Sequence, residues 1–188
     1  IRYDPKYGGQ GLDYWHDLVF VEEMGRITAG GVSMGITVQT HMATPAIDEF
    51  GSDYLKETYL KAAIAGEMIG AIAVTEPDAG SDVAALSTTA KKDGGDYLIN
   101  GSKIYITNGT QADFFTLLAK TSEEPGYHSF SLLVVPADLP GVTVGRKLEK
   151  LGTHISDTAE LFFDNVRIPD RNRIGNEGEG FIYQMKQF

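Results

Sequence analysis

Apolar residues in the first third of the chain recur at the spacing of α-helices. Asp13 can cap a helix, and after it this spacing continues at Trp15, Leu18, Val19, Met24 and Ile27. The segment 32–43 mixes small, Thr and Met residues without a charged face, which predicts a helix buried on most sides. Capping residues followed by helical spacing predict two more helices, which span 44–51 and 52–66.

From Ile69 onward the period shortens, and short apolar runs alternate with glycine-containing turns. These runs predict strands at 69–74, 88–92, 97–100, 104–107, 114–120, 130–136, 142–147, 160–163 and 166–169. The turn 93–96 separates two of these runs with Asp-Gly-Gly-Asp, which predicts a hairpin. Many short strands with glycine turns indicate a sandwich or a barrel, and a helical pattern returns at 177–188.

Composition and charge narrow the class of protein. The chain has 188 residues, of which 42% are apolar, and a net charge of −10, which argues against nucleic acid as a main partner. No apolar run is long enough to cross a bilayer. There are no cysteines, so disulfides and thiolate chemistry are excluded. The chain begins at Ile1 without Met and stops inside a helical pattern, so we expect that both ends are truncated. The sequence therefore neither indicates nor excludes a targeting peptide.

The stretch 73–82, Ala-Val-Thr-Glu-Pro-Asp-Ala-Gly-Ser-Asp, follows the first apolar run and turns sharply. Pro77 fixes one backbone angle, and Gly80 permits a conformation that side chains forbid. A turn of this kind presents backbone N–H groups and a hydroxyl to one point, which suits an anion or the polar edge of a ring. Taken alone, an ordinary exit from a strand is the better explanation of this turn.

A second segment, Lys-Ile-Tyr-Ile-Thr-Asn-Gly at 103–109, accompanies the first. Together the two resemble the paired flavin-binding signatures of the acyl-CoA dehydrogenase family. The resemblance continues through 152–161 and Gly-Glu-Gly-Phe at 178–181, and it covers nearly the whole chain from Tyr7 onward. The residues at 69–73, and Asp-Thr-Ala-Glu-Leu-Phe-Phe at 157–163, are similar to the sequences of the long-chain branch of that family.

The resemblance implies an α+β fold in three parts. These are an N-terminal helical domain over 1–67, a middle β-barrel domain that binds flavin over 68–174, and the start of a C-terminal helical bundle over 175–188. It implies FAD as the cofactor, with binding residues Ile72, Ala73, Val74, Thr75, Gly80, Ser81, Tyr105, Ile106 and Thr107.

The resemblance also assigns roles to single residues. The backbone N–H and hydroxyl of Thr75 would meet the N1 and O2 edge of the flavin, where fixed donors favour the reduced state. Thr107 would hydrogen-bond flavin N5, and the ring of Tyr105 would pack on the flavin where many members have Trp. Ser81 would lie near the FAD pyrophosphate and the pantetheine arm of acyl-CoA, and Phe188 near the acyl-CoA. Each is also an ordinary strand, turn or helix residue.

The resemblance places the general base, a glutamate, beyond Phe188, so no catalytic residue is expected in this chain and Glu76 is not assigned that role. The helix from Gly35 to Met42 would line the acyl pocket, although core packing also explains it. The four histidines, His16, His41, His128 and His154, show no metal spacing, and Ser156-Asp157-Thr158 is interpreted as a capped turn.

The whole enzyme would convert acyl-CoA to trans-2-enoyl-CoA in fatty-acid β-oxidation and pass electrons to an electron-transferring flavoprotein. The family implies a homotetramer, in the bacterial cytoplasm or the mitochondrial matrix. Two alternatives stay open. One is an acyl-CoA oxidase or flavin monooxygenase relative that uses oxygen, and the other is a binding fragment without flavin.

Overall fold

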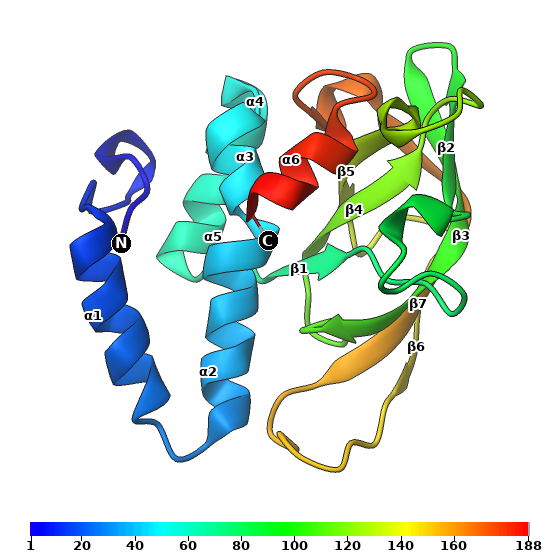
Figure 1. The fold of residues 1–188 in the computed structure, drawn as a ribbon. Coiled ribbons are helices and arrows are strands. Elements are labelled where there is room, and N and C mark those ends of the chain that lie inside the picture. The colour runs from blue at the N-terminus through cyan, green and yellow to red at the C-terminus, as the bar shows by residue number, and fades with distance from the viewer. Residues whose placement is uncertain (188) are drawn as a thin grey trace.

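The computed structural model describes residues 1–187, in which a layer of helices packs against one curved β-sheet (Figure 1). The helical layer comes first in the sequence and the strands follow, so the predicted α+β class and the predicted order are confirmed. The last helix, α6 (Gly180–Gln187), returns from the sheet toward the helical layer and contacts α3 (Figure 1).

The helical layer is built from short segments with identifiable ends. They are η1 (Pro5–Tyr7), α1 (Tyr14–Gly25), α2 (Gly30–Thr37), η2 (Val38–Ala43), α3 (Pro45–Phe50), α4 (Asp53–Leu55), η3 (Lys56–Leu60) and α5 (Lys61–Ala65). The predicted cap of α1 is confirmed, because Asp13 accepts hydrogen bonds from the N–H groups of Trp15 and His16. Gly66 ends α5 in the left-handed conformation, with φ of 76°.

The prediction that 32–43 is buried on most sides is wrong for the first half of this segment, whereas Val38 and Ala43 in the second half are buried. Val32, Met34 and Ile36 of α2 are each about 40% exposed, at 40%, 44% and 37%. The apolar stripe of α1 is exposed as well, with Trp15 at 75%. The reason is geometric, since α1 stands at the outer edge of the helical layer and leaves one side of α2 uncovered by the described residues (Figure 1).

Sequence patterns did not predict that the helical run continuing α2 widens into a π-helix at η2. Polar side chains fix this wide turn to the sheet. The side chain of Gln39 accepts from Gly70 N at 3.2 Å and donates to Ala63 O at 2.9 Å. The Thr116 hydroxyl donates to Ala43 O at 2.6 Å. These contacts hold η2 against β1 and β4, and π-helical turns are frequent at functional sites.

The strands form one eight-stranded sheet. They are β1 (Gly70–Ala73), β2 (Thr89–Asp93), β3 (Asp96–Thr107), β4 (Phe114–Lys120), β5 (Phe130–Pro136), β6 (Val142–Lys147), β7 (Thr158–Pro169) and β8 (Arg173–Ile174). The order is β6-β7-β3-β2-β4-β5-β8, and β1 pairs in parallel with β4. Short 3₁₀ turns lie at η4 (Val83–Ala85), η5 (Tyr127–Ser129) and η6 (Asp170–Asn172). The predicted hairpin at 93–96 is confirmed.

The alternation of side chains along the strands divides the core in two. On β4, Phe114 and Leu118 face the helices, where they join Val38 and Leu60 in a first cluster. The alternate residues of the same strand, Phe115, Leu117 and Ala119, point into the curve of the sheet. They form a second cluster with residues that include Ala71, Ala73, Ile106 and Leu161. The end of β1 therefore lies between the two clusters.

Candidate functional site

A cavity of about 190 Å³ lies where the helical layer meets the ends of β1 and β3. It is lined by Met34, Val38, Met42, Ile72, Val74, Thr75, Tyr105, Ile106 and Thr107. Ligand sites commonly enclose about 300–1,000 Å³, and this cavity is smaller than that. We therefore interpret its lining residues as one wall of a ligand site and not as a complete pocket. A larger groove of about 370 Å³ runs elsewhere along α2, but none of the predicted cofactor residues lines it.

The first predicted segment and the strand before it reach the cavity through Ile72, Val74 and Thr75. Ile72 and Val74 line it, whereas the Ala73 side chain points into the second core cluster, as strand alternation requires. Thr75 follows, half-buried, where the chain leaves the strand. No backbone carbonyl of residues 1–187 accepts from the Thr75 N–H. An N–H without a backbone partner on a cavity wall is available to a ligand.

The second segment reaches the cavity at an irregularity in the sheet. Between Lys103 and Ile106 the pairing of β3 with β7 shifts register, and Tyr105 lies in this shift with φ of +62°. A left-handed aromatic residue is uncommon, and such strain concentrates at functional sites. The Tyr105 side chain is 65% exposed and lines the cavity with Thr107. A backbone hydrogen bond of 2.9 Å from Ile104 N to Thr75 O joins the two segments.

A buried ion pair joins the first segment to the second. The Lys103 ammonium is 2.9 Å from Glu76 Oε1, and both side chains are almost fully buried. Burial alone would raise the pKa of Glu76, but Lys103 and the hydrogen bonds from Ser87 and Thr88 lower it to about 2. Burial lowers the pKa of Lys103 to about 8 despite the neighbouring carboxylate. Glu76 is therefore ionised and held in place by Lys103, Ser87 and Thr88.

Two further polar contacts hold the loop after β3. Asn108, with φ of +64°, donates from its amide to Gly35 O of α2 at 2.9 Å. The Asp157 carboxylate accepts from Thr110 N at 2.7 Å and from the Gln111 amide at 3.0 Å. The interpretation of 156–158 as a local capped turn is thus wrong for Asp157, because its partners lie 46 and 47 residues away.

The remaining predicted site residues are not part of the cavity wall. Gly80 is close to Thr75, since a Cβ on Gly80 would meet Thr75 Cγ2 at 3.8 Å. Ser81 is exposed, and the cap of η4 is Asp82, which accepts from Ala84 N at 3.1 Å. Phe188 lies outside the described residues. The roles of Ser81 and Phe188 in acyl-CoA binding stay predictions.

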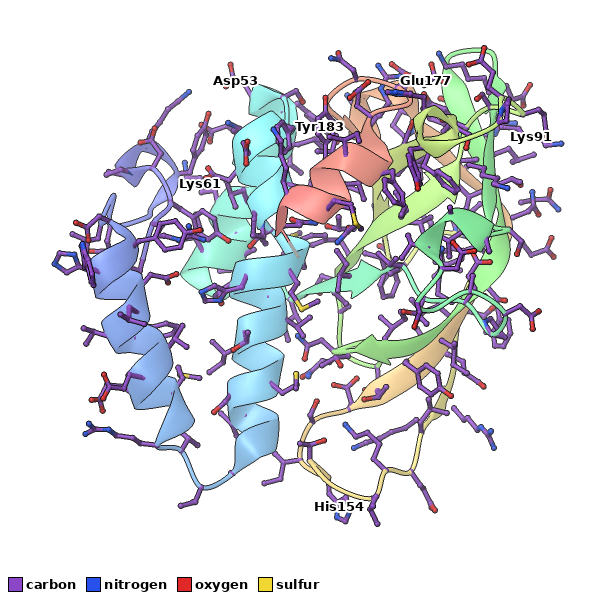
Figure 2. The ribbon with its side chains drawn as sticks, in the orientation of Figure 1. Asp53, Lys61, Lys91, His154, Glu177 and Tyr183 are labelled. Carbon is purple, nitrogen blue, oxygen red and sulfur yellow. The ribbon has the colours of Figure 1, made fainter. Side chains whose placement is uncertain are left out.

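Sequence reasoning assigned no role to Lys103, Asn108 or Asp157. For Lys103 a signal existed, because a lysine at an inward position of an apolar strand must find a partner. Within residues 1–187, no group of His, Asp and Glu residues could hold a metal ion. His154, for example, lies near the tip of the loop between β6 and β7 (Figure 2). No helix within this part of the chain is long and apolar enough to cross a membrane.

Comparison with known proteins points to one family. Residues 1–67 match the family model described as acyl-CoA dehydrogenase, N-terminal domain, and residues 71–166 match acyl-CoA dehydrogenase, middle domain. An acyl-CoA dehydrogenase of Bacillus subtilis is 43% identical over 98% of this chain and 48% of its own length. The long-chain specific mitochondrial enzyme of Sus scrofa is 39% identical over 100% of this chain and 44% of its own.

Solved structures agree. The crystal structure of acyl-CoA dehydrogenase from Geobacillus kaustophilus covers 99% of this chain with a TM-score of 0.92 and 44% identity, and 49% of that chain is covered. A structure described as the FAD complex of PigA superimposes with a TM-score of 0.96 and 32% identity. The match covers 99% of this chain and 49% of the PigA chain. The chain spans about half the length of the curated relatives it matches.

Proposed function

Because the chain belongs to the acyl-CoA dehydrogenase family, we propose that its protein is an FAD-dependent oxidoreductase that α,β-dehydrogenates acyl-CoA thioesters. The observation that carries this proposal is the cavity wall, in which residues from both predicted flavin segments, Thr75 and Tyr105 to Thr107, lie side by side.

The residues on the wall fit a flavin. A flavin has a flat apolar body and a row of hydrogen-bonding atoms along one edge. The wall offers apolar side chains from Met34, Val38 and Ile72, and beside them the Thr75 N–H, which lacks a backbone acceptor. The hydroxyls of Thr75 and Thr107 add polar groups to the same surface. When bound, FAD would supply an acceptor for the hydride that leaves the β-carbon.

The chain's own residues would bind and orient, and we assign proton abstraction from the α-carbon to none of them. Glu76 lies within the first segment, and both of its carboxylate oxygens already accept hydrogen bonds, from Lys103, Ser87 and Thr88. Thr75 and Thr107 would fix the polar edge of the ring. Tyr105 would cover its exposed side, and Met34, Val38 and Met42 of the helical wall would border the acyl group.

Partners follow from the same proposal. Acyl-CoA is the substrate class, an electron-transferring flavoprotein is the proposed acceptor, and a homotetramer is the proposed assembly. A relative that uses oxygen would share the cavity wall, because the wall holds the flavin and does not select the acceptor. Oxygen consumption, compared with reduction of a flavoprotein acceptor, separates these two activities.

The test is reconstitution followed by reduction. Purified protein is mixed with FAD, and excess cofactor is removed. We expect a flavin absorption band that stays with the protein and that acyl-CoA bleaches under anaerobic conditions. Thr75→Val and Thr107→Val should each weaken FAD binding by about fivefold to thirtyfold, since each loses a hydrogen bond worth about 1–2 kcal/mol.

A matched control is Thr143→Val, which changes an exposed threonine on β6 away from the cavity. This variant should bind FAD as the unmodified protein does. A protein that retains no flavin at any FAD concentration, while folded by circular dichroism, would refute the proposal and favour a binding fragment without flavin.

A further inference from the structure

A lysine behind the cavity wall has no part in the proposed function so far. Lys103 is on β3 and only 1% exposed. Its ammonium group donates to Val74 O at 2.8 Å, to Leu118 O at 2.8 Å and to Glu76 Oε1 at 2.9 Å. An ammonium group has three donors, so all are used. Burying a charge costs desolvation energy, and a well-packed apolar pair is often as stable as a buried ion pair. Stability alone therefore does not explain why a lysine occupies this position.

The bond to Val74 O controls the direction of the next N–H. The Val74 carbonyl and the Thr75 N–H belong to one trans peptide unit, in which the two groups point in opposite directions. Lys103 holds the carbonyl, so the Thr75 N–H points away from the ammonium. Thr75 lines the cavity, and its N–H has no backbone acceptor in the described part of the chain. The lysine thus fixes an available donor from behind.

The same lysine ties together the segments around that donor. Its neighbour Ile104 donates from its N–H to Thr75 O at 2.9 Å, which fixes the peptide unit on the other side of Thr75. Glu76, the partner of Lys103, also accepts from Ser87 N at 2.7 Å and from Thr88 N at 2.9 Å. Both carbonyls that flank Thr75, its own and that of Val74, are therefore held by β3.

We propose that Lys103 is a positioning residue that holds the Thr75 amide in the orientation required to bind the polar edge of the flavin. This inference rests on the proposed function. A donor that is fixed before the ligand arrives loses no freedom on binding, so its full hydrogen-bond energy contributes to affinity. The prediction is that the position of Thr75, and not the charge on Lys103 alone, determines how well FAD binds.

Three variants separate position from stability. Lys103→Met keeps an unbranched apolar side chain but removes the ammonium group and leaves Glu76 as an unpaired buried charge, so it should lower both Tm and FAD affinity. Glu76→Gln combined with Lys103→Met removes that charge and should recover most of the Tm. The control is Lys91→Met, which changes an exposed lysine in the middle of β2, far from α2 (Figure 2). FAD dissociation constants come from flavin fluorescence, with Tm and the flavin absorption spectrum measured on each sample.

We expect the double variant to bind FAD at least about tenfold more weakly than the unmodified protein, with an altered flavin spectrum, even though its Tm is recovered. Lys91→Met should match the unmodified protein. If the double variant regains both Tm and affinity, or if folded Lys103→Met binds FAD unchanged, the inference is overturned. If the unmodified protein binds no FAD, the proposed function falls and this inference with it.

A measurement on the unmodified protein does not depend on any variant folding. The Ile104 and Thr88 amides, which donate to Thr75 O and Glu76, report whether the arrangement exists before FAD binds. We expect hydrogen exchange at both amides to be slow and nearly equal with and without FAD. Fast exchange without FAD that becomes slow only with FAD would show that the cofactor, and not Lys103, orders the segment, and would overturn the inference.

Discussion

The contact between Gly31 of α2 and the loop before β7 offers a sharp test of how the helical layer meets the sheet. A Cβ on Gly31 would lie 2.4 Å from Ser156 N and 3.0 Å from Ile155 C. Both are backbone atoms that cannot rotate away. Its neighbour Gly30, in the same turn of the same helix, has nothing within 4 Å of the corresponding position. The two glycines are a matched pair in which only the packing differs.

The expected magnitude follows from two opposing effects. Alanine is favoured over glycine in helices by up to about 1 kcal/mol, and both Gly30→Ala and Gly31→Ala gain this term. Only Gly31→Ala must also push α2 away from the loop, and overpacking of this kind costs about 1–3 kcal/mol. The difference between the two variants removes the shared term. We therefore expect the free energy of unfolding of Gly31→Ala to be about 1–3 kcal/mol lower than that of Gly30→Ala.

Urea unfolding followed by circular dichroism measures this difference, with free energies obtained by linear extrapolation. For a chain of this size, each kcal/mol corresponds to about 2–4 °C in Tm, which thermal unfolding can check independently. If the two variants agree within about 0.5 kcal/mol, the close approach of α2 to Ser156 does not hold in solution, and the position assigned to the helical wall of the cavity is wrong.

Three further outcomes can be measured. The pKa of Glu76 is about 2 in the folded state, against an ordinary 4.5. Its ionised form therefore stabilises the fold above about pH 4.5, and this stabilisation is lost as the pH falls toward 2. In Glu76→Gln, the free energy of unfolding should depend less on pH in that window. Asp157→Ala, which leaves Thr110 N without its partner, should lower the free energy of unfolding by about 1–3 kcal/mol in urea, with an unchanged value contradicting the assigned role. Tyr105→Gly removes left-handed strain, so thermal unfolding should show little or no loss of stability while FAD affinity falls; a large drop in Tm would contradict this.

Strands with uninterrupted apolar runs between turns could be predicted residue for residue, as 114–120 and 130–136 show. The two runs predicted at 160–163 and 166–169 are one strand, β7. The polar residues between them hid this continuity. Asn165 has φ of +52° and donates from its N–H to the Asn100 side chain at 2.9 Å, so the irregularity is held by a side chain 65 residues away.

The site was predictable where a local motif sufficed and not where a distant partner decides. Thr75 and Thr107 could be named because they belong to recognisable segments, and the structure brings them to one cavity wall. The contact from Asn108 to Gly35 joins positions 73 residues apart, and no local pattern encodes it. The wide turn of η2 depends likewise on Gln39 reaching two different elements, which spacing in the sequence does not reveal.

The first core cluster has a consequence for how the molecule can be divided. Val38 and Leu60, from the segment that matches one family model, share their contacts with Phe114 and Leu118, from the segment that matches the other. A cut between the two would expose an apolar face on each piece, and only the second cluster, whose residues all lie within 71–168, would stay whole. Because the first cluster is shared, we expect the two segments to unfold as one cooperative unit, which calorimetry should record as a single melting transition for this chain.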